Sequence, residues 1–215
     1  GQIPDDIVRD MAKKNNLGAW NVYAALYGSP EQIEVNWQII NHFFKKHPKC
    51  VITTEKEEAG NPVFQYRADL MRGKPNLTEF GLYNWRGGGG SIWFSPVSQA
   101  MGSETLKQME MAKRIMARHG LDYVGEFIVG WRDMHHIIDV LFDKTRPEEV
   151  KAAHDCFSEL LAEFSKAGYG TYRTNTAFMD KVADTYGPVQ KAVFKRLKKA
   201  LDPNGILAPG KSGIR

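Results

Sequence analysis

Two stretches of the chain, residues 103–119 and residues 147–166, repeat apolar side chains at helical spacing. A surface helix shows this pattern because one side of it faces the core while the other side faces water. Each stretch ends at a glycine, Gly120 in the first case and Gly168 in the second, and glycine is a common helix terminator. Both stretches are therefore expected to be amphipathic helices.

A third helix is expected to begin directly after Ser29. Pro30 suits the first helical position, and Gln32 stands three residues after Ser29, which is the spacing of a capping box. The apolar stripe of this helix runs from Ile33 to Phe44.

Strands are expected where β-forming and apolar residues run together, in residues 19–27, 51–54, 92–97, 123–129 and 135–142. The last two carry apolar residues on both faces, which is typical of central strands in a sheet covered by helices. Residues 55–80 carry scattered glycine and proline and are expected to be irregular.

The order of these elements resembles that of α+β folds, in which helices pack on a mostly antiparallel sheet. We expect such a domain, with ferredoxin-like elements, over residues 1–168. Residues 169–215 read as two helices and an extended tail rich in proline and glycine. This last segment has no further strand to pair with, so we expect it to pack on the sheet or on a domain outside this chain.

Composition is that of an ordinary globular protein, with 42% hydrophobic and 25% charged residues among 215. The 29 basic and 25 acidic residues are interspersed, and the basic run at residues 195–199 fits a solvated helix face better than a nucleic-acid patch. No apolar run approaches the ~18 residues of a membrane span. Cys50 and Cys156 have no metal spacing and are expected to be buried free thiols. We therefore expect no nucleic-acid partner, no membrane span and no metal.

The first residues show no basic region followed by an apolar stretch, so they indicate no secretory signal. The chain also begins without methionine, which suggests a processed chain or an excised fragment. Localisation stays open between the bacterial cytoplasm and the periplasm.

Three polar residues in the apolar strands are candidates for chemistry. Glu126 lies in the middle of an apolar run, where a carboxylate must be paired, protonated or facing a cavity; an exposed or salt-bridged Glu126 at a sheet edge is an equally good interpretation. His135 and Asp139 are four apart on one strand and share a face, so they could form a histidine–carboxylate pair. A hydrogen-bonded core histidine is the simpler alternative, and His136 points the other way.

Other motifs carry weaker signals. Residues 205–212 match the phosphate-binding pattern GxxxxGK[ST], but a helix is expected before them and only three residues follow, whereas the motif needs a strand before and a helix after. The glycine run at residues 87–90 lets backbone approach a ligand closely, although a flexible loop is commoner. Tyr172 and Arg173 place a phenol and a guanidinium side by side, a good donor pair for an oxyanion.

Read together, several motifs resemble the vanillyl-alcohol oxidase and 4-cresol dehydrogenase family of flavoproteins. The segments that carry the resemblance are Gly170–Asn175, Tyr186–Val189 and Leu201–Gly213, with Trp93–Val97, Glu126–Val129 and Arg132–His136 upstream. The resemblance covers nearly the whole chain and is closest to the hydroxylating 4-cresol dehydrogenase branch, with eugenol hydroxylases as a close alternative.

The resemblance implies a 4-alkylphenol substrate whose benzylic carbon loses a hydride to flavin, giving a quinone methide to which water adds. Tyr172 and Arg173 fall where the family binds the phenolate. Glu126, His135 and Asp139 fall on the pocket carboxylates and histidine, and either carboxylate is a candidate base for the water.

The resemblance also implies FAD: Tyr83 falls where the 4-cresol dehydrogenase branch carries FAD through a tyrosyl ether, and Glu79 lies beside it. A tyrosine at this place favours the dehydrogenase branch over the oxidase branch, which uses a histidine. Lys211 stands where that branch carries an arginine, and it is expected to contact the cofactor. The implied partners are a cytochrome c subunit as electron acceptor and a second flavoprotein subunit in a homodimer.

Family members begin with a FAD-binding domain that this sequence does not contain. We therefore expect the chain to be a substrate-capping domain, residues 1–168, with a segment that returns to that domain, residues 169–215, and to be inactive alone. The alternative from another class is a non-catalytic ligand-binding domain that reuses the capping fold.

Overall fold

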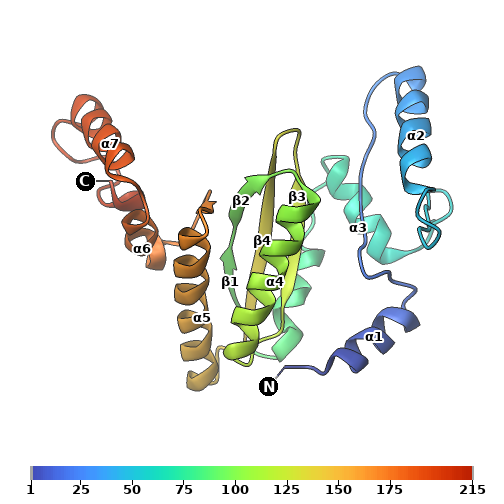
Figure 1. Ribbon diagram of the computed structural model, residues 1–215, viewed down its shortest axis with the longest axis horizontal. Helices are drawn as coiled ribbons and strands as arrows, with labels where there is room; N and C mark the ends of the chain where they lie inside the picture. Colours follow the sequence, from blue (N-terminus) through green and yellow to red (C-terminus); the bar gives the residue numbers. More distant parts are fainter. Residues whose placement is uncertain (1, 215) are drawn as a thin grey trace. The chain divides into compact units, whose positions relative to one another are not determined.

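The computed structural model describes residues 2–214 and divides into two compact units. Pro4–Gly81 forms the N-terminal unit, and the chain from Leu82 onward, with the residues before Pro4, forms the sheet unit (Figure 1). The boundary expected near Gly168 does not coincide with this division, because the residues on both sides of it lie in the sheet unit. The return of the last segment to a separate domain stays a prediction.

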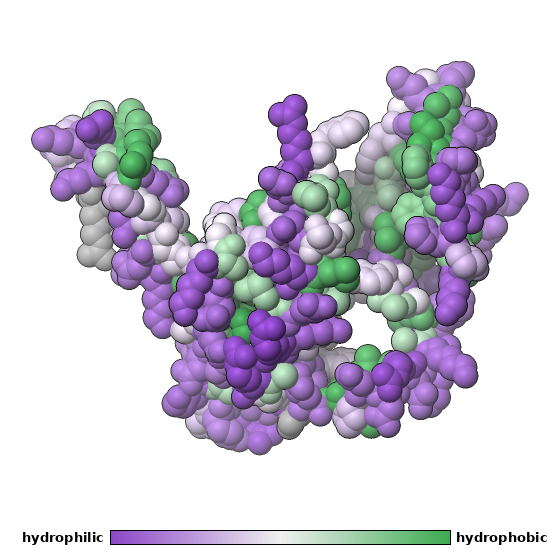
Figure 2. All heavy atoms as spheres, viewed as in Figure 1, coloured by the Kyte–Doolittle hydropathy of each residue, from purple (hydrophilic) through white to green (hydrophobic). Residues whose placement is uncertain are grey.

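The N-terminal unit contains three helices within its described residues, namely α1 (Asp5–Lys14), α2 (Pro30–Phe44) and α3 (Pro62–Met71). The 3-10 helix η1 (Thr78–Arg86) begins in this unit and ends in the other. No residue of Pro4–Gly81 is buried. The unit therefore has no hydrophobic core of its own, and Figure 2 shows apolar surface over α2.

The capping box at the start of α2 is confirmed, with Ser29 and Gln32 side chains each bonded to the other's backbone. Four expectations for this unit are wrong. Cys50 is a free thiol but is exposed rather than buried. Residues 19–27 and 51–54 are not strands, since they pair with no described strand and β-propensity alone does not hold one. Residues 55–80 are not irregular throughout, because they contain α3. The Asn61 side chain caps this helix by accepting hydrogen bonds from the backbone N–H groups of Val63 and Phe64. Asn61 followed by Pro62 is a local helix-start signal like Ser29 followed by Pro30.

The sheet unit is built on an antiparallel sheet, as expected. Within residues 2–214 its strands are β1 (Gly90–Phe94), β2 (Pro96–Gln99), β3 (Val124–Val129), β4 (Asp133–Phe142) and β5 (Gly170–Thr171). β4 pairs with β3 along one edge and with both β1 and β2 along the other.

The strand expected at residues 92–97 is split in two at Ser95. Phe94 lies opposite Ile138 and Val97 lies opposite His135, so β1 and β2 follow one another in a single register. The interruption coincides with Pro96, whose nitrogen has no hydrogen to give to a ladder.

Helices α4 (Gly102–Arg118) and α5 (Pro147–Lys166) form as expected and pack on one face of the sheet (Figure 1). Their apolar sides meet Ile138 and Val140 of β4 in the core. Phe94 contacts both Phe157 and Phe164 of α5 edge to face, with ring centroids 5.6 and 5.3 Å apart. This face forms the hydrophobic core of the sheet unit.

The expectation that both long strands are central is confirmed for β4 and wrong for β3. Every residue of β4 from Ile137 to Phe142 is buried, whereas Gly125, Glu126, Ile128 and Val129 of β3 are exposed. β3 is an edge strand in the described part of the chain, because its outer side pairs with no other strand.

After β5 the chain forms η2 (Thr176–Phe178), α6 (Met179–Asp184), α7 (Pro188–Leu201) and η3 (Lys211–Gly213). The two expected helices of this segment are confirmed. α7 has no buried residue, and Val189 and Leu201 are 76% and 77% exposed. Figure 2 shows apolar surface over α7. No described helix is both long and apolar enough to cross a membrane.

Candidate functional site

The candidate residues gather on the face of the sheet turned away from α4 and α5. Side chains alternate along β4, so His136 points to the helices while His135 and Asp139 point to the other face. Residues directly opposite one another in an antiparallel pair share a face. Trp93, opposite Asp139, and Glu126, opposite Ile137, therefore lie on this face too.

Asp139 is a buried carboxylic acid, with only 1% of its surface exposed. The Ser91 hydroxyl donates a hydrogen bond of 2.6 Å to its Oδ1, and Oδ2 is buried with no hydrogen-bond partner in the described structure. Burial raises the pKa of Asp139 to about 7, and the Ser91 hydrogen bond opposes part of that rise. A carboxyl group with this pKa can take up or release a proton near neutrality.

The expected pair between His135 and Asp139 does not form. His135 Nε2 lies 2.8 Å from Oδ2 of Asp133, and Asp139 is held by Ser91 instead. The two residues do share a face, but four residues along a strand span about 13 Å, which is too far for a hydrogen bond. His136 is the core histidine: it is fully buried, its Nε2 lies 2.8 Å from the Tyr123 hydroxyl, and burial lowers its pKa to about 3.

Tyr172 and Arg173 directly follow β5. The Tyr172 backbone N–H and the hydroxyl of Thr171 both donate to the carbonyl of Ser95, which ties this turn to the interruption between β1 and β2. The Tyr172 ring lies 4.5 Å from the His135 ring between centroids, and the Arg173 guanidinium lies 5.2 Å from the Tyr172 ring centroid. The structure therefore brings a phenol, a guanidinium and an imidazole together.

Tyr83 lies in the part of η1 that belongs to the sheet unit. The indole Nε1–H of Trp93 donates a hydrogen bond of 3.0 Å to the Tyr83 phenolic oxygen, and the two rings meet edge to face. Trp93 lies opposite Asp139 in the pairing of β1 with β4. The Trp93 side chain therefore stands between Tyr83 and the strand position of the buried carboxyl. Glu79 is exposed and belongs to the N-terminal unit.

Arg86 anchors the end of η1 to the sheet unit. Its guanidinium donates two hydrogen bonds to Glu149 at the start of α5, of 2.9 and 3.2 Å, and one of 3.3 Å to Asp122. The side chains of Arg86 and Glu149 are 13% and 11% exposed, so the pair is largely withdrawn from water. The Arg86 guanidinium lowers the pKa of Glu149 to about 2. This network fixes the segment that carries Tyr83.

Lys211 lies apart from the cluster, exposed in η3. Glu126 shares the sheet face with His135 and Asp139 but is exposed on β3, which agrees with its interpretation as an edge residue. Residues 205–212 do not form a phosphate-binding loop. They follow α7 rather than a strand, and the carboxylate of Asp202 accepts the backbone N–H groups of Ile206 and Leu207, at 3.0 and 2.9 Å.

Ser91 and Trp93 are contact residues that the sequence did not single out. Both stand at alternate positions of one strand and so share a face, but this pattern is only a weak indication of a functional site. Their importance depends on the register that places them against Asp139, and no local pattern encodes that register.

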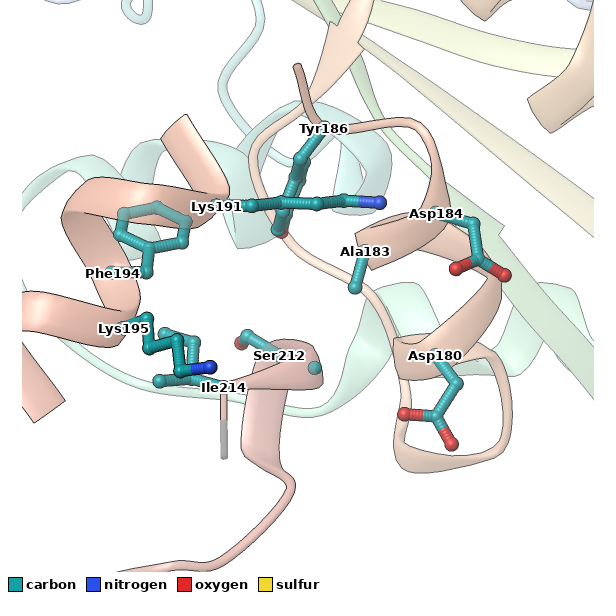
Figure 3. A pocket seen from close by; sticks show the side chains of 10 residues that line it. Asp180, Ala183, Asp184, Tyr186, Lys191, Phe194, Lys195, Ser212 and Ile214 are labelled. Carbon is teal, nitrogen blue, oxygen red and sulfur yellow. The ribbon is translucent and has the colours of Figure 1, made fainter. Parts of the chain in front are cut away.

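A cavity of about 470 Å³ lies between α6, α7 and η3 (Figure 3). Lys191 and Lys195 line it from α7, and Asp180 and Asp184 stand on α6. It shares no residue with the cluster on β4, and none of the candidates from the sequence lines it.

Comparisons with known proteins show the family to which the chain belongs. The family model for FAD linked oxidases, C-terminal domain, matches residues 6–212. The chain is 59% identical over 214 residues to the flavoprotein subunit of hydroxylating 4-cresol dehydrogenase from Pseudomonas putida, covering all of this chain and 41% of that protein. It is 28% identical over 134 residues to a 1'-carboxy-chondrochloren decarboxylase from Chondromyces crocatus, covering 59% of this chain and 23% of that protein.

Two solved structures match the whole chain. A crystal structure of p-cresol methylhydroxylase with substrate bound superposes with a TM-score of 0.94 at 59% identity, with 42% of that chain covered. A 4-ethylphenol oxidase from Gulosibacter chungangensis, in an isoeugenol complex, gives 0.93 at 34% identity, with 43% covered. The chain thus spans about two fifths of the length of these structures. With the family model matched over nearly its full length, the chain belongs to the FAD-linked oxidases, as their C-terminal domain.

Proposed function

We propose that this chain is the substrate-capping, C-terminal portion of a flavoprotein that oxidises the benzylic carbon of 4-alkylphenols. The observation that carries the proposal is the cluster of Tyr172, Arg173 and His135, whose His135 shares a sheet face with the buried acid Asp139. The 59% identity to a 4-cresol dehydrogenase subunit supports a phenol as the substrate.

In this proposal Tyr172 and Arg173 bind the phenolate oxygen, one through a phenolic O–H and the other through a charge-assisted hydrogen bond. The phenolate charge helps to expel a hydride from the benzylic carbon, which leaves a quinone methide. Water then adds to that carbon while its proton passes to a carboxylate, and the phenolate is restored. Asp139 suits the carboxylate role because its pKa of about 7 makes it a base near neutral pH; exposed Glu126 is the other candidate.

Flavin adenine dinucleotide, when bound, supplies the acceptor for the hydride. Tyr83 fits a place beside it, since its phenolic oxygen is fixed by the Trp93 indole on the same side of the sheet unit as Asp139. We propose that the cofactor is attached through Tyr83 and that Glu79 and Lys211 contact it. Most cofactor contacts would come from a further part of a longer protein, of which this chain represents about two fifths if it resembles its relatives.

The exposed apolar side chains of α7, and of an N-terminal unit without buried residues, suit a protein in which further surface covers them. We propose that this surface includes a FAD-binding domain and a second flavoprotein subunit, and that a cytochrome c subunit receives the electrons.

The test uses the full-length flavoprotein under anaerobic conditions. Flavin absorbance should bleach when 4-cresol is added and should persist with 4-methylanisole, which cannot form a phenolate. Rates with 4-cresol, vanillyl alcohol and eugenol distinguish the branches of the family, and reoxidation by cytochrome c or by oxygen identifies the acceptor. If no phenol bleaches the flavin, the catalytic proposal fails and the non-catalytic ligand-binding alternative takes its place.

A further inference from the structure

We propose that Ser91 is a positioning residue for Asp139: its hydroxyl holds Oδ1, so that the proton from water is taken up at Oδ2. The inference rests on the proposed function, because it assigns a partner to the acid that the function uses. It adds a residue to the site that neither the motifs nor the comparisons point to.

The strand register creates the contact between Ser91 and Asp139. Ser91 lies opposite Leu141 and Trp93 lies opposite Asp139, so Ser91 is the diagonal neighbour of the acid on the same face. Gly90 allows this close approach at the start of β1, since a Cβ there would lie 2.4 Å from the Phe142 carbonyl oxygen. The backbone pairing thus places the Ser91 hydroxyl 2.6 Å from Oδ1 of Asp139.

The two oxygens of the Asp139 carboxyl have different surroundings. Oδ1 accepts the Ser91 hydrogen bond, while Oδ2 is buried and has no hydrogen-bond partner among residues 2–214. A hydrogen bond to a carboxylate favours its charged form, and burial disfavours it. Ser91 therefore keeps a buried acid ionisable near neutral pH and leaves the other oxygen as the one that exchanges a proton.

Other titratable groups near this position are engaged elsewhere. On the same face, His135 is paired with Asp133, and Glu126 is exposed on β3. Tyr83 meets the indole of Trp93, and on the helix-facing side His136 meets the Tyr123 hydroxyl. Ser91 is thus the hydrogen-bond donor to Asp139 in the described structure.

The test compares Ser91→Ala, Ser91→Thr and Ser91→Val in the full-length flavoprotein, with Ser98→Ala on β2 as a control. Threonine keeps the hydroxyl, and valine has the same shape without it. We expect the acidic limb of the pH profile for hydroxylated product to move up by about one pH unit in the Ala and Val variants. Threonine should restore the wild-type limb, and Ser98→Ala should leave it unchanged.

Identical pH limbs in the Thr and Val variants would overturn the inference, as would an unchanged limb in Ser91→Ala. If the Ala variant does not fold, comparing the pH limbs of the Thr and Val variants still tests the role of the hydroxyl. A wild-type enzyme that no phenol reduces would sink the proposed function instead, so the two failures are distinguishable.

Discussion

The indole nitrogen of Trp93 donates a hydrogen bond to the phenolic oxygen of Tyr83 at 3.0 Å. This contact fixes the atom through which we propose that the cofactor is attached. An ether oxygen can still accept a hydrogen bond, so the same contact is compatible with the free phenol and with the attached form.

Tyr83→Phe should abolish covalent attachment of flavin, because phenylalanine has no oxygen for the link. In the full-length protein, denaturation should leave the wild-type polypeptide yellow and the variant colourless, with its flavin released to the filtrate. Tyr186→Phe, in the C-terminal segment, is the control and should keep the colour. A yellow Tyr83→Phe polypeptide would place the link elsewhere.

Arg173→Ala should slow flavin reduction by 4-cresol on the order of 100-fold, the usual effect of removing one donor from an oxyanion site. Arg114→Ala, at an exposed position of α4 on the other side of the sheet, should leave the rate within about twofold, since surface charges away from a site contribute little. Stopped-flow absorbance under anaerobic conditions measures both. Equal rates in the two variants would remove Arg173 from the site.

Arg86→Ala should destabilise the protein by about 2 kcal/mol, because it removes two charge-assisted hydrogen bonds from the largely buried Glu149, which keeps only Arg146 and the Asp143 N–H as partners in the described structure. Arg118→Ala is the matched control. It breaks the exposed Arg118–Glu159 ion pair and should cost less than about 1 kcal/mol. Urea denaturation of the full-length variants measures the free energy of unfolding. Similar losses in the two variants would mean that the Arg86 network stabilises the protein no more than an exposed ion pair does.

The buried His136 should make stability fall in acid. Its folded pKa of about 3 lies below the value of an unfolded histidine, so its contribution is fully present above about pH 6.5 and is lost as pH falls toward 3. His136→Leu should flatten the dependence of the unfolding free energy on pH in that window, while His42→Gln, at an exposed site, should not. Parallel curves for His136→Leu and wild type would contradict this.

Gly213→Ala should loosen the C-terminal turn from α6, because the added Cβ would lie 2.1 Å from Cβ of Ala183. Gly205→Ala is a close control: its φ of +66° matches the +67° of Gly213, but no atom lies within 4 Å of its added Cβ. Both variants carry the same backbone strain, and only the first adds a clash. Hydrogen exchange of α6 should therefore speed up more in Gly213→Ala, and equal exchange would argue against the packing.

Local signals in the sequence predicted much of the fold. α4 and α5 follow from apolar spacing and glycine stops, and the start of α2 follows from its capping box, because these features act within a few residues. The α+β class and the antiparallel sheet follow from the order of such elements. Tyr172 and Arg173 were a weak signal as a dipeptide, and the resemblance pointed to them and to Tyr83 as site residues.

Only the tertiary structure decided which polar groups meet. The sequence placed His135 and Asp139 on one face of a strand. In the structure Asp139 accepts a hydrogen bond from Ser91, and His135 pairs with Asp133. It also made β3 an edge strand and left residues 19–27 outside the sheet. Strand pairing joins residues that are far apart in the chain, so its register depends on the packing of the whole sheet, while helix periodicity and capping are set by neighbours in sequence.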